Sequence, residues 1–380
     1  MGEERVIGQP RPIRDAASKV TGRKAYVGDM SLPGMLVGKL LLSDRPHARV
    51  LSVDTSEART MPGVHAVVTW EDCPDVRYNS AQRMIDAQVP LTERVLAREV
   101  RHVGDRVAAV AAETEEQAMA ALRAIRVTYE DLPAVLSIDE ALAPGAEPVH
   151  GTSNVVGVLE KGDKDIEAHL AACPHVVSGS FSTPPIHQGA IETHCAMANW
   201  SEEGKLTVIT PCQNSFAYRV ILAQIFGLPL NRVRVVVPAI GGGFGGKLEM
   251  TIEPVAALLS RKARRPVKMV LSRKETIMAT RVRHGSQSRV RMGVDDQGKL
   301  LAIDVDCETN TGAYAGSAFN VAGALLENPF QLYKAPYVHV RVRPVYTNTV
   351  PGGAMRGYGG PEVYFATECM VDRAARAIGA

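Results

Sequence analysis

The stretch Gly241-Gly-Gly-Phe-Gly-Gly-Lys247 places five glycines within seven residues. Residues without side chains let the backbone approach an anion or a flat ligand closely, and their N–H groups can form an anion-binding nest. The apolar run at 232–237 predicts a strand before this loop, and a helix is expected to begin after it. Phe244 has little to pack against locally, so we expect it to contact a ligand. The alternative is a tight turn that packs the strand on the helix.

The loop also satisfies two familiar nucleotide-binding patterns, and both matches fail on inspection. A Walker A loop needs Ser or Thr after the lysine to bind Mg²⁺, but this chain has Leu248. The GxGxxG fingerprint needs a carboxylate about 20 residues later for the ribose. The corresponding stretch at 261–265 is basic instead, and the next acid is Glu275. An arginine suits a 2′-phosphate, so an NADP- or nucleotide-binding enzyme stays open as an alternative.

Outward from the loop, strand-like and helical segments alternate. Strands are predicted at 38–43, 63–69 and 106–111, each bounded by turn residues. Thr114 and Gln117 form a capping box that predicts the start of a helix. Asn214 is expected to cap a second helix that runs to about residue 226 and stops at Gly227. This mixture predicts an α+β (mixed α/β) fold.

Two further stretches bear on domain organisation. Residues 131–158 are rich in Pro, Ala and Gly, which is typical of a linker that crosses to a second domain. The last twenty residues predict a helix with Pro361 in its first turn. Its apolar side is expected to comprise Tyr364, Phe365, Cys369, Val371, Ala374, Ala375 and Ile378.

Composition limits the class of protein. Lys and Arg number 43 and Asp and Glu 41 in 380 residues, and a net charge of +2 gives no support for nucleic-acid binding. The N-terminus lacks the apolar core of a secretory signal, and no apolar stretch is long enough to span a bilayer. The six cysteines have no metal-cluster spacing. We therefore expect a cytoplasmic protein with reduced thiols and no membrane contact.

Three more segments accompany the loop in a fixed order. They are Ile191-Glu-Thr-His-Cys195, Thr210-Pro-Cys-Gln-Asn214 and Gly353-Ala-Met-Arg-Gly-Tyr-Gly-Gly-Pro-Glu362. Together the four resemble the molybdopterin-binding subunit of the xanthine dehydrogenase / aldehyde oxidase family, the molybdenum hydroxylases. The resemblance implies an a/b hammerhead domain at 1–140, a linker at 141–160 and the first half of the molybdopterin-binding domain at 161–380.

The resemblance also implies roles for individual residues near the cofactor. Gln213 matches the glutamine whose amide donates to the apical oxo ligand of molybdenum, and an uncharged amide suits that task. Glu192 and His194 match a neighbouring segment, to which we assign a structural role as a buried hydrogen-bonded pair. Both backbone stretches that approach the metal centre are implied as well: Gly242, Gly243, Phe244 and Gly245 on one side, and Ala354, Met355 and Arg356 on the other. Among these residues, the resemblance implies a catalytic role for Gln213, Phe244 and Arg356.

Substrate contacts are implied for Tyr358 and Leu248. Tyr358 matches an aromatic position that stacks on a planar substrate, and an aromatic face suits a flat heterocycle. In purine-oxidising members a glutamate follows the lysine of the glycine loop, but here that residue is Leu248. Glu249 comes next, and one position along a helix would rotate it about 100° away. The pocket is therefore expected to favour a less polar edge than that of xanthine.

The implied reaction is hydroxylation of an aromatic N-heterocycle or aldehyde-like carbon with oxygen from water. The cofactor would be molybdenum-molybdopterin, in a dinucleotide form such as the cytosine dinucleotide. No residue matches the family's catalytic glutamate, so a second molybdopterin subunit is expected to carry it, in a split arrangement resembling nicotinate dehydrogenase. Separate [2Fe-2S] and FAD subunits are also expected as partners.

Two other interpretations of the chain stay open beside the nucleotide-binding one. The same scaffold could run in reverse, as a reductive dehydroxylase of an aromatic substrate such as an aryl-CoA thioester. The chain could also be a binding or scaffold protein without activity of its own.

Overall fold

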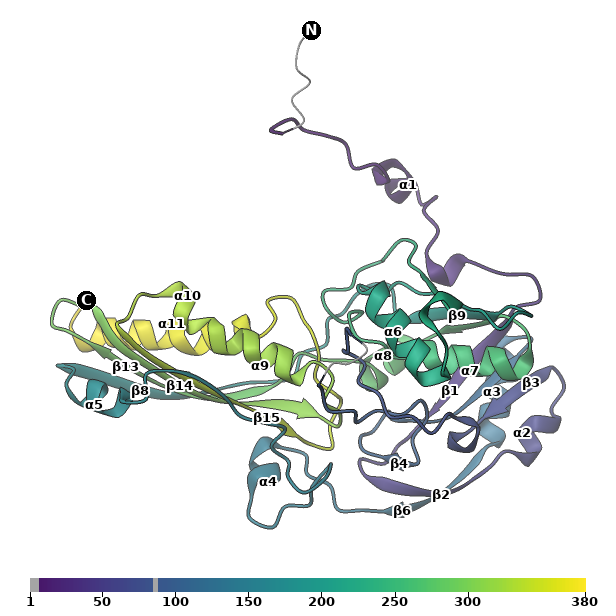
Figure 1. Ribbon diagram of the computed structural model, residues 1–380, viewed down its shortest axis with the longest axis horizontal. Coiled ribbons are helices and arrows are strands. Elements are labelled where there is room, and N and C mark those ends of the chain that lie inside the picture. The colour runs from purple at the N-terminus through teal and green to yellow at the C-terminus, as the bar shows by residue number, and fades with distance from the viewer. Residues whose placement is uncertain (1–6, 85–87) are drawn as a thin grey trace, which may run out of the picture.

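The computed structural model describes residues 7–84 and 88–380 and contains three β-sheets in two lobes (Figure 1). The largest sheet has seven strands, in the order β11 (Val233–Val236), β10 (Leu206–Ile209), β9 (Cys195–Trp200), β12 (Val267–Val270), β1 (Leu36–Leu42), β5 (Arg106–Ala112) and β3 (Val64–Val68). The strands predicted at 38–43, 63–69, 106–111 and 232–237 are confirmed. Parallel pairing of β1 with β12 unites segments from both halves of the chain in one sheet.

Three helices pack against strands of this sheet: α6 (Ser215–Phe226), α7 (Glu253–Ala263) and α3 (Glu115–Ala124). The Asn214 side chain accepts from Ala217 N, and Gly227 ends α6 with a left-handed φ of 63°, as the sequence predicts. The capping box of Thr114 and Gln117 is likewise present at α3. Leu222, Leu259 and their neighbours on α6 and α7 pack with the sheet into the main apolar core.

A small sheet lies below the large one in Figure 1 and consists of β4 (Glu99–Val100), β2 (Ala48–Asp54) and β6 (Arg126–Asp131). Short helices connect the remaining parts of this lobe: η1 (Val27–Asp29), α2 (Ser56–Thr60), η2 (Trp70–Asp72), η3 (Leu230–Arg232) and α8 (Arg273–Ala279). Helix α1 (Ala16–Val20) lies on an N-terminal arm that extends away from the lobe (Figure 1). None of the helices in the described ranges is both long and apolar enough to cross a membrane.

The other lobe is a five-stranded sheet in the order β7 (Leu159–Gly162), β15 (Tyr337–Tyr346), β14 (Leu300–Gly312), β13 (Ser286–Val294) and β8 (His175–Thr183). Helices α9 (Ala318–Glu327), α10 (Pro329–Leu332) and α11 (Gly360–Ala377) lie along one face, while α5 (Ile166–Ala171) lies on the other (Figure 1). The mixed α/β fold that the sequence predicts is confirmed.

Helix α11 forms where the sequence predicts it, with Pro361 in its first turn, but the predicted apolar side is partly wrong. Val363, Ala366, Met370 and Ala374 are the apolar residues that the helix buries against the sheet. Phe365 is 48% exposed. The buried positions repeat every three or four residues, so the geometry of the sheet, rather than the size of each side chain, selects the face.

The Pro-, Ala- and Gly-rich stretch is packed against the second lobe. It contains α4 (Ile138–Leu142), and Val135, Ile138 and Val149 form a small core with Val345 and Tyr346. The division at 1–140, 141–160 and 161–380 stays a prediction. All six cysteines are free thiols, and three of them, Cys195, Cys212 and Cys307, are buried.

Candidate cofactor-binding site

Gln213 fixes the shape of the glycine loop through its side-chain oxygen. Oε1 accepts hydrogen bonds from the N–H groups of Gly245 at 3.0 Å and Lys247 at 3.3 Å. A Cβ added to Gly243 would stand 2.5 Å from Oε1, so a larger residue at this position would displace the amide from these two hydrogen bonds. With its acceptor occupied, Gln213 presents the amide N–H₂ group, which no acceptor in the described residues engages.

Glu192 and His194 hold the loop from behind. Glu192 Oε2 accepts from Gly241 N and from Lys247 Nζ, both at 2.7 Å, and His194 Nε2 lies 2.9 Å from Gly246 O. The two residues therefore bind the loop and not each other, which corrects the predicted Glu/His pair. Burial lowers the pKa of His194 to about 4, so the ring is neutral and donates from Nε2 to the carbonyl.

The buried ion pair of Lys247 bears on the nucleotide-binding alternative. Lys247 is 2% exposed and its ammonium is paired with Glu192. A phosphate-binding lysine needs its charge directed at the ligand, and withdrawing this one would leave Glu192 without its counter-ion. Lys247 therefore has a structural role, and the Walker-like spacing does not indicate a nucleotide-binding site in this chain.

The segment 353–356 closes on the glycine loop from the other side. Arg356 N donates to Phe244 O at 2.8 Å, and Gln188 Nε2 donates to Ala354 O at 2.8 Å. Gly245 has a φ of +99°, and a Cβ there would lie 2.5 Å from Ala354 O. Two segments more than a hundred residues apart thus form one double-sided cradle, in which Met355 is half-buried and the Arg356 side chain is exposed.

Backbone strain is concentrated at the predicted site. Only three non-glycine residues of the described ranges have a positive φ: Phe244 at 50°, Tyr358 at 44° and Arg264 at 53°. Arg264 ends helix α7, where this conformation is common. Phe244 lies in the glycine loop, and Tyr358 lies two residues beyond the segment 353–356. Strained backbone of this kind persists where the surrounding structure holds it in place, which is common at functional sites. Phe244 is also 48% exposed, which leaves its ring available to a ligand.

Unpartnered donors line the cradle. The N–H groups of Gly242, Gly243 and Phe244 make no hydrogen bond to any described residue, although Gly243 is buried. Buried backbone N–H groups are rarely left without an acceptor. Together with the Gln213 amide they offer four donor groups beside an exposed aromatic ring. This set fits the oxo groups and flat pterin ring of molybdopterin.

The predicted helix directly after the loop is absent. Residues 248–252 are irregular, and α7 begins only at Glu253. The expected rotation of Glu249 away from Leu248 therefore has no helical basis. Leu248 is half-buried, whereas Glu249 is fully buried and turned into the protein. The backbone between loop and helix is irregular because Lys247 and Glu249 are both drawn into buried ion pairs.

Tyr358 is placed next to this buried carboxylate. Its phenol oxygen is shielded from solvent and makes no hydrogen bond of good geometry to a described residue, although the side chains of Ser317 and Asn320 lie close enough to interact with it. Burial raises the pKa of the phenol, and the negative charge of Glu249 acts in the same direction. A protonated hydroxyl in this position is able to donate to a ligand, in addition to the ring contact that the sequence suggests.

A buried charge cluster behind the loop escaped the sequence analysis. Arg281 pairs with Glu249 at 2.8 Å and with Glu93 at 2.6 Å, and it donates to Ser80 Oγ at 2.6 Å. Ser317 also donates to Glu249. Arg283 similarly pairs with Glu362 at 3.2 Å and donates to the carbonyl of Arg356. No local motif marks these residues, because each partner lies far away along the chain.

Family models match both halves of the chain. Residues 149–380 match the molybdopterin cofactor-binding domain, and residues 21–133 match the a/b hammerhead domain of aldehyde oxidase and xanthine dehydrogenase. The chain is 35% identical over 370 residues to the xanthine dehydrogenase molybdenum-binding subunit of Escherichia coli O157:H7, covering 96% of this chain and 49% of that protein. It spans about half the length of the first relatives that it matches.

One relative is of similar length. The nicotinate dehydrogenase large molybdopterin subunit of Eubacterium barkeri is 33% identical over 380 residues, which cover 100% of this chain and 88% of that one. Among solved structures, the aldehyde oxidoreductase of Desulfovibrio gigas superposes with a TM-score of 0.92 at 29% identity, over 97% of this chain and 42% of that chain. Quinoline 2-oxidoreductase of Pseudomonas putida 86 gives 0.87 at 30% identity, over 96% and 48%. The chain belongs to the xanthine dehydrogenase and aldehyde oxidase family of molybdopterin-binding oxidoreductase subunits.

Proposed function

We propose that this chain holds one side of a molybdopterin cofactor in a multi-subunit oxidoreductase that hydroxylates an electron-poor carbon. The observation that carries the proposal is the double-sided cradle, in which unpartnered donors of the glycine loop accompany the exposed Phe244 ring. When bound, molybdopterin supplies the two-electron acceptor for oxidation of the substrate. The residues that would hold it are Gln213, Gly242, Gly243, Phe244 and Gly245, with Ala354, Met355 and Arg356 opposite.

The residues of the chain would orient both cofactor and substrate. Gln213 donates through its amide because the loop occupies its oxygen. Leu248 and Tyr358 would present an apolar edge and an aromatic face with one hydroxyl donor. Relatives are named for nicotinate, quinoline, xanthine and aldehyde substrates. The lack of a carboxylate at position 248 supports an aromatic N-heterocycle or aldehyde less polar than xanthine.

The rest of the catalyst would come from partners. A second molybdopterin subunit would carry the general-base glutamate and supply most of the remaining contacts to the cofactor, and [2Fe-2S] and FAD subunits would remove the electrons. Support comes from the Eubacterium barkeri relative, whose name describes a large molybdopterin subunit.

The test is to purify the tagged chain with its native partners and to measure molybdenum and pterin per chain, together with hydroxylation of nicotinate, quinoline and benzaldehyde. Gln213→Leu should lower metal retention or turnover about 10- to 100-fold, the usual cost of losing an outer contact to a metal centre. Gln297→Leu, in an exposed turn, is the matched control. Stoichiometric NADP in place of molybdenum, or a Gln213→Leu complex indistinguishable from the control, would refute the proposal.

A further inference from the structure

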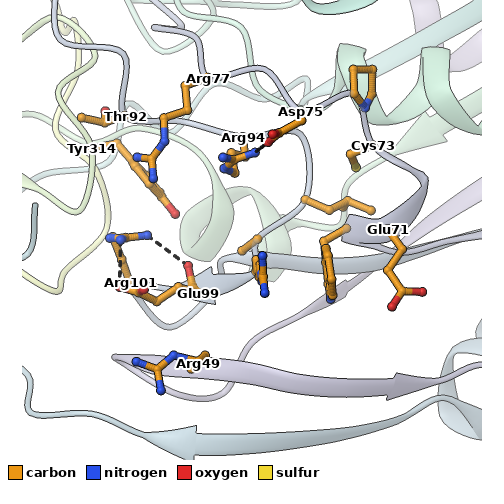
Figure 2. Close-up of a pocket in the computed structure, with 15 residues that line it drawn as sticks. Arg49, Glu71, Cys73, Asp75, Arg77, Thr92, Arg94, Glu99, Arg101 and Tyr314 are labelled. Atoms are coloured by element: carbon orange, nitrogen blue, oxygen red, sulfur yellow. Dashed lines mark hydrogen bonds and ion pairs between the residues drawn. The ribbon is translucent and has the colours of Figure 1, made fainter.

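A separate cavity of about 520 Å³ lies beside β4 and is lined by five arginines (Figure 2). They are Arg49, Arg77, Arg94, Arg98 and Arg101. Trp70 and Tyr314 contribute aromatic walls. None of the cradle residues lines this cavity, so it is a second feature of the molecule and does not depend on the proposed function.

Four of the five arginines have partners. Arg94 pairs with Asp75 at 2.5 Å and Arg101 with Glu99 at 2.8 Å. Arg49 pairs with Glu130, and the guanidinium of Arg98 lies 4.8 Å from the centre of the Trp70 ring. These contacts leave Arg77 as the one lining arginine with no ion pair, hydrogen bond or ring contact to a described residue.

The surroundings of Arg77 contain more positive than negative charge. Partial burial and the nearby guanidinium groups of Arg94 and Arg101 lower its pKa, and the carboxylate of Glu99 opposes them only in part. Figure 2 shows the Arg77 side chain descending into the cavity beside Tyr314, on the side where Arg94 and Arg101 also project. Like charges held together in a partly enclosed space repel, and an anion placed between them removes that repulsion.

The lining is suited to binding and not to covalent chemistry. Burial raises the pKa of the Cys73 thiol to about 12, so it is protonated at neutral pH and is a poor nucleophile. None of the described lining residues is a histidine that could act as a general base. Three carboxylates line the cavity. Those of Asp75 and Glu99 are engaged in ion pairs, whereas Glu71 has no ion pair to a described residue and lies on the far side of the cavity from Arg77 (Figure 2).

We propose that this cavity binds a phosphate-type oxyanion between Arg77, Arg94 and Arg101. The planar fork of arginine matches two oxygens of a phosphate at once, and three such groups converge here. Asp75 is 90% exposed, so an incoming oxyanion competes with it easily for Arg94. The cavity exceeds the size of one phosphate group, and its aromatic walls leave room for an organic phosphate as well as for the inorganic ion.

Isothermal titration calorimetry of the full chain tests this site. The probes are inorganic phosphate and adenosine monophosphate, with adenosine and with sodium chloride at equal ionic strength as blanks. Wild type should bind at least one phosphate probe and neither blank. Arg77→Ala should weaken that binding at least tenfold, because a charge-assisted hydrogen bond contributes about 1.5–3 kcal/mol. Tighter binding of adenosine monophosphate than of phosphate would assign an organic source, and the reverse order the free ion.

Two variants guard the interpretation. Arg123→Ala, on the exposed side of α3, removes the same charge outside the cavity and should retain wild-type affinity. Arg77→Lys keeps the charge without the fork and should fall between wild type and Arg77→Ala. The proposal is overturned if wild type binds neither phosphate probe, or if Arg77→Ala and Arg123→Ala bind equally well.

Discussion

Two groups of arginines in this molecule contrast in how their charges are balanced. Behind the glycine loop, Arg281 is 5% exposed and pairs with two carboxylates, Glu93 and Glu249, that are almost fully buried. In the cavity beside β4, Arg94 is 36% exposed, its partner Asp75 is 90% exposed, and Arg77 has no partner among the described residues.

The contrast separates a structural role from a binding role. A charge removed from water is tolerated only when its partners surround it, and the Arg281 cluster meets that condition. A charge at an open cavity is stabilised by water, so it needs no partner within the fold and stays available to a ligand. The buried cluster is therefore expected to fix the loop, and the open one to bind an anion.

The largest expected effect comes from Arg281→Ala. It would leave Glu93 and Glu249 buried without a counter-ion, and we expect the free energy of unfolding to fall by about 3–5 kcal/mol. Arg94→Ala is the matched control, because an exposed pair contributes only about 0–1 kcal/mol. Urea denaturation measures both. If the free energy of unfolding falls equally in the two variants, the buried and the exposed arginines do not differ in their structural role.

The glycine loop offers a test of intermediate size. In Gly245→Ala the new Cβ would meet Ala354 O at a residue whose φ is +99°. We expect a loss of about 2–3 kcal/mol, from the left-handed backbone and the displaced carbonyl together. Gly204→Ala has a φ of +76° with no atom within 4 Å of the new Cβ, so it carries the backbone cost alone. Thermal melting of both variants should rank Gly245→Ala as the less stable, and the opposite order would show that the cradle is not close-packed.

Two buried histidines near the cradle predict a smaller, pH-dependent effect. Burial lowers the pKa of His194 and of His284 to about 4, and the cations of Arg283 and Arg281 act on His284 in the same direction. Near pH 5 the unfolded chain binds more protons than the folded chain, so stability is full above about pH 6.5 and declines toward pH 4.

At pH 5 each of the two histidines should lower the free energy of unfolding by about 2 kcal/mol relative to its value at neutral pH. Denaturation of wild type and His284→Gln at pH 7.5 and pH 5 measures this, and the variant should lose about half of the change expected from the two histidines. If the free energy of unfolding falls equally in both proteins between pH 7.5 and pH 5, His284 does not contribute to the pH dependence and the prediction is wrong.

Local features were predicted well because near neighbours determine them. The Asn214 and Thr114 caps and the apolar run at 232–237 need only a few consecutive residues, and the structure confirms all three. The predicted side of the last helix included Phe365, which is exposed, since the buried face depends on where the five-stranded sheet lies. The helix expected after the loop failed for a related reason: distant carboxylates and cations engage residues 247 and 249.

The sequence by itself determined the glycine-rich loop, the order of its companion motifs and hence the family. Those features depend on residue identity and on order along the chain. Only the tertiary structure decided what each side chain contacts, because those partners lie far apart in sequence. Arg281 reaches Glu93 across 188 positions, and Gln213 meets the loop across 32. The same holds for Arg77, whose lack of a partner becomes visible only when Arg94 and Arg101 are folded beside it.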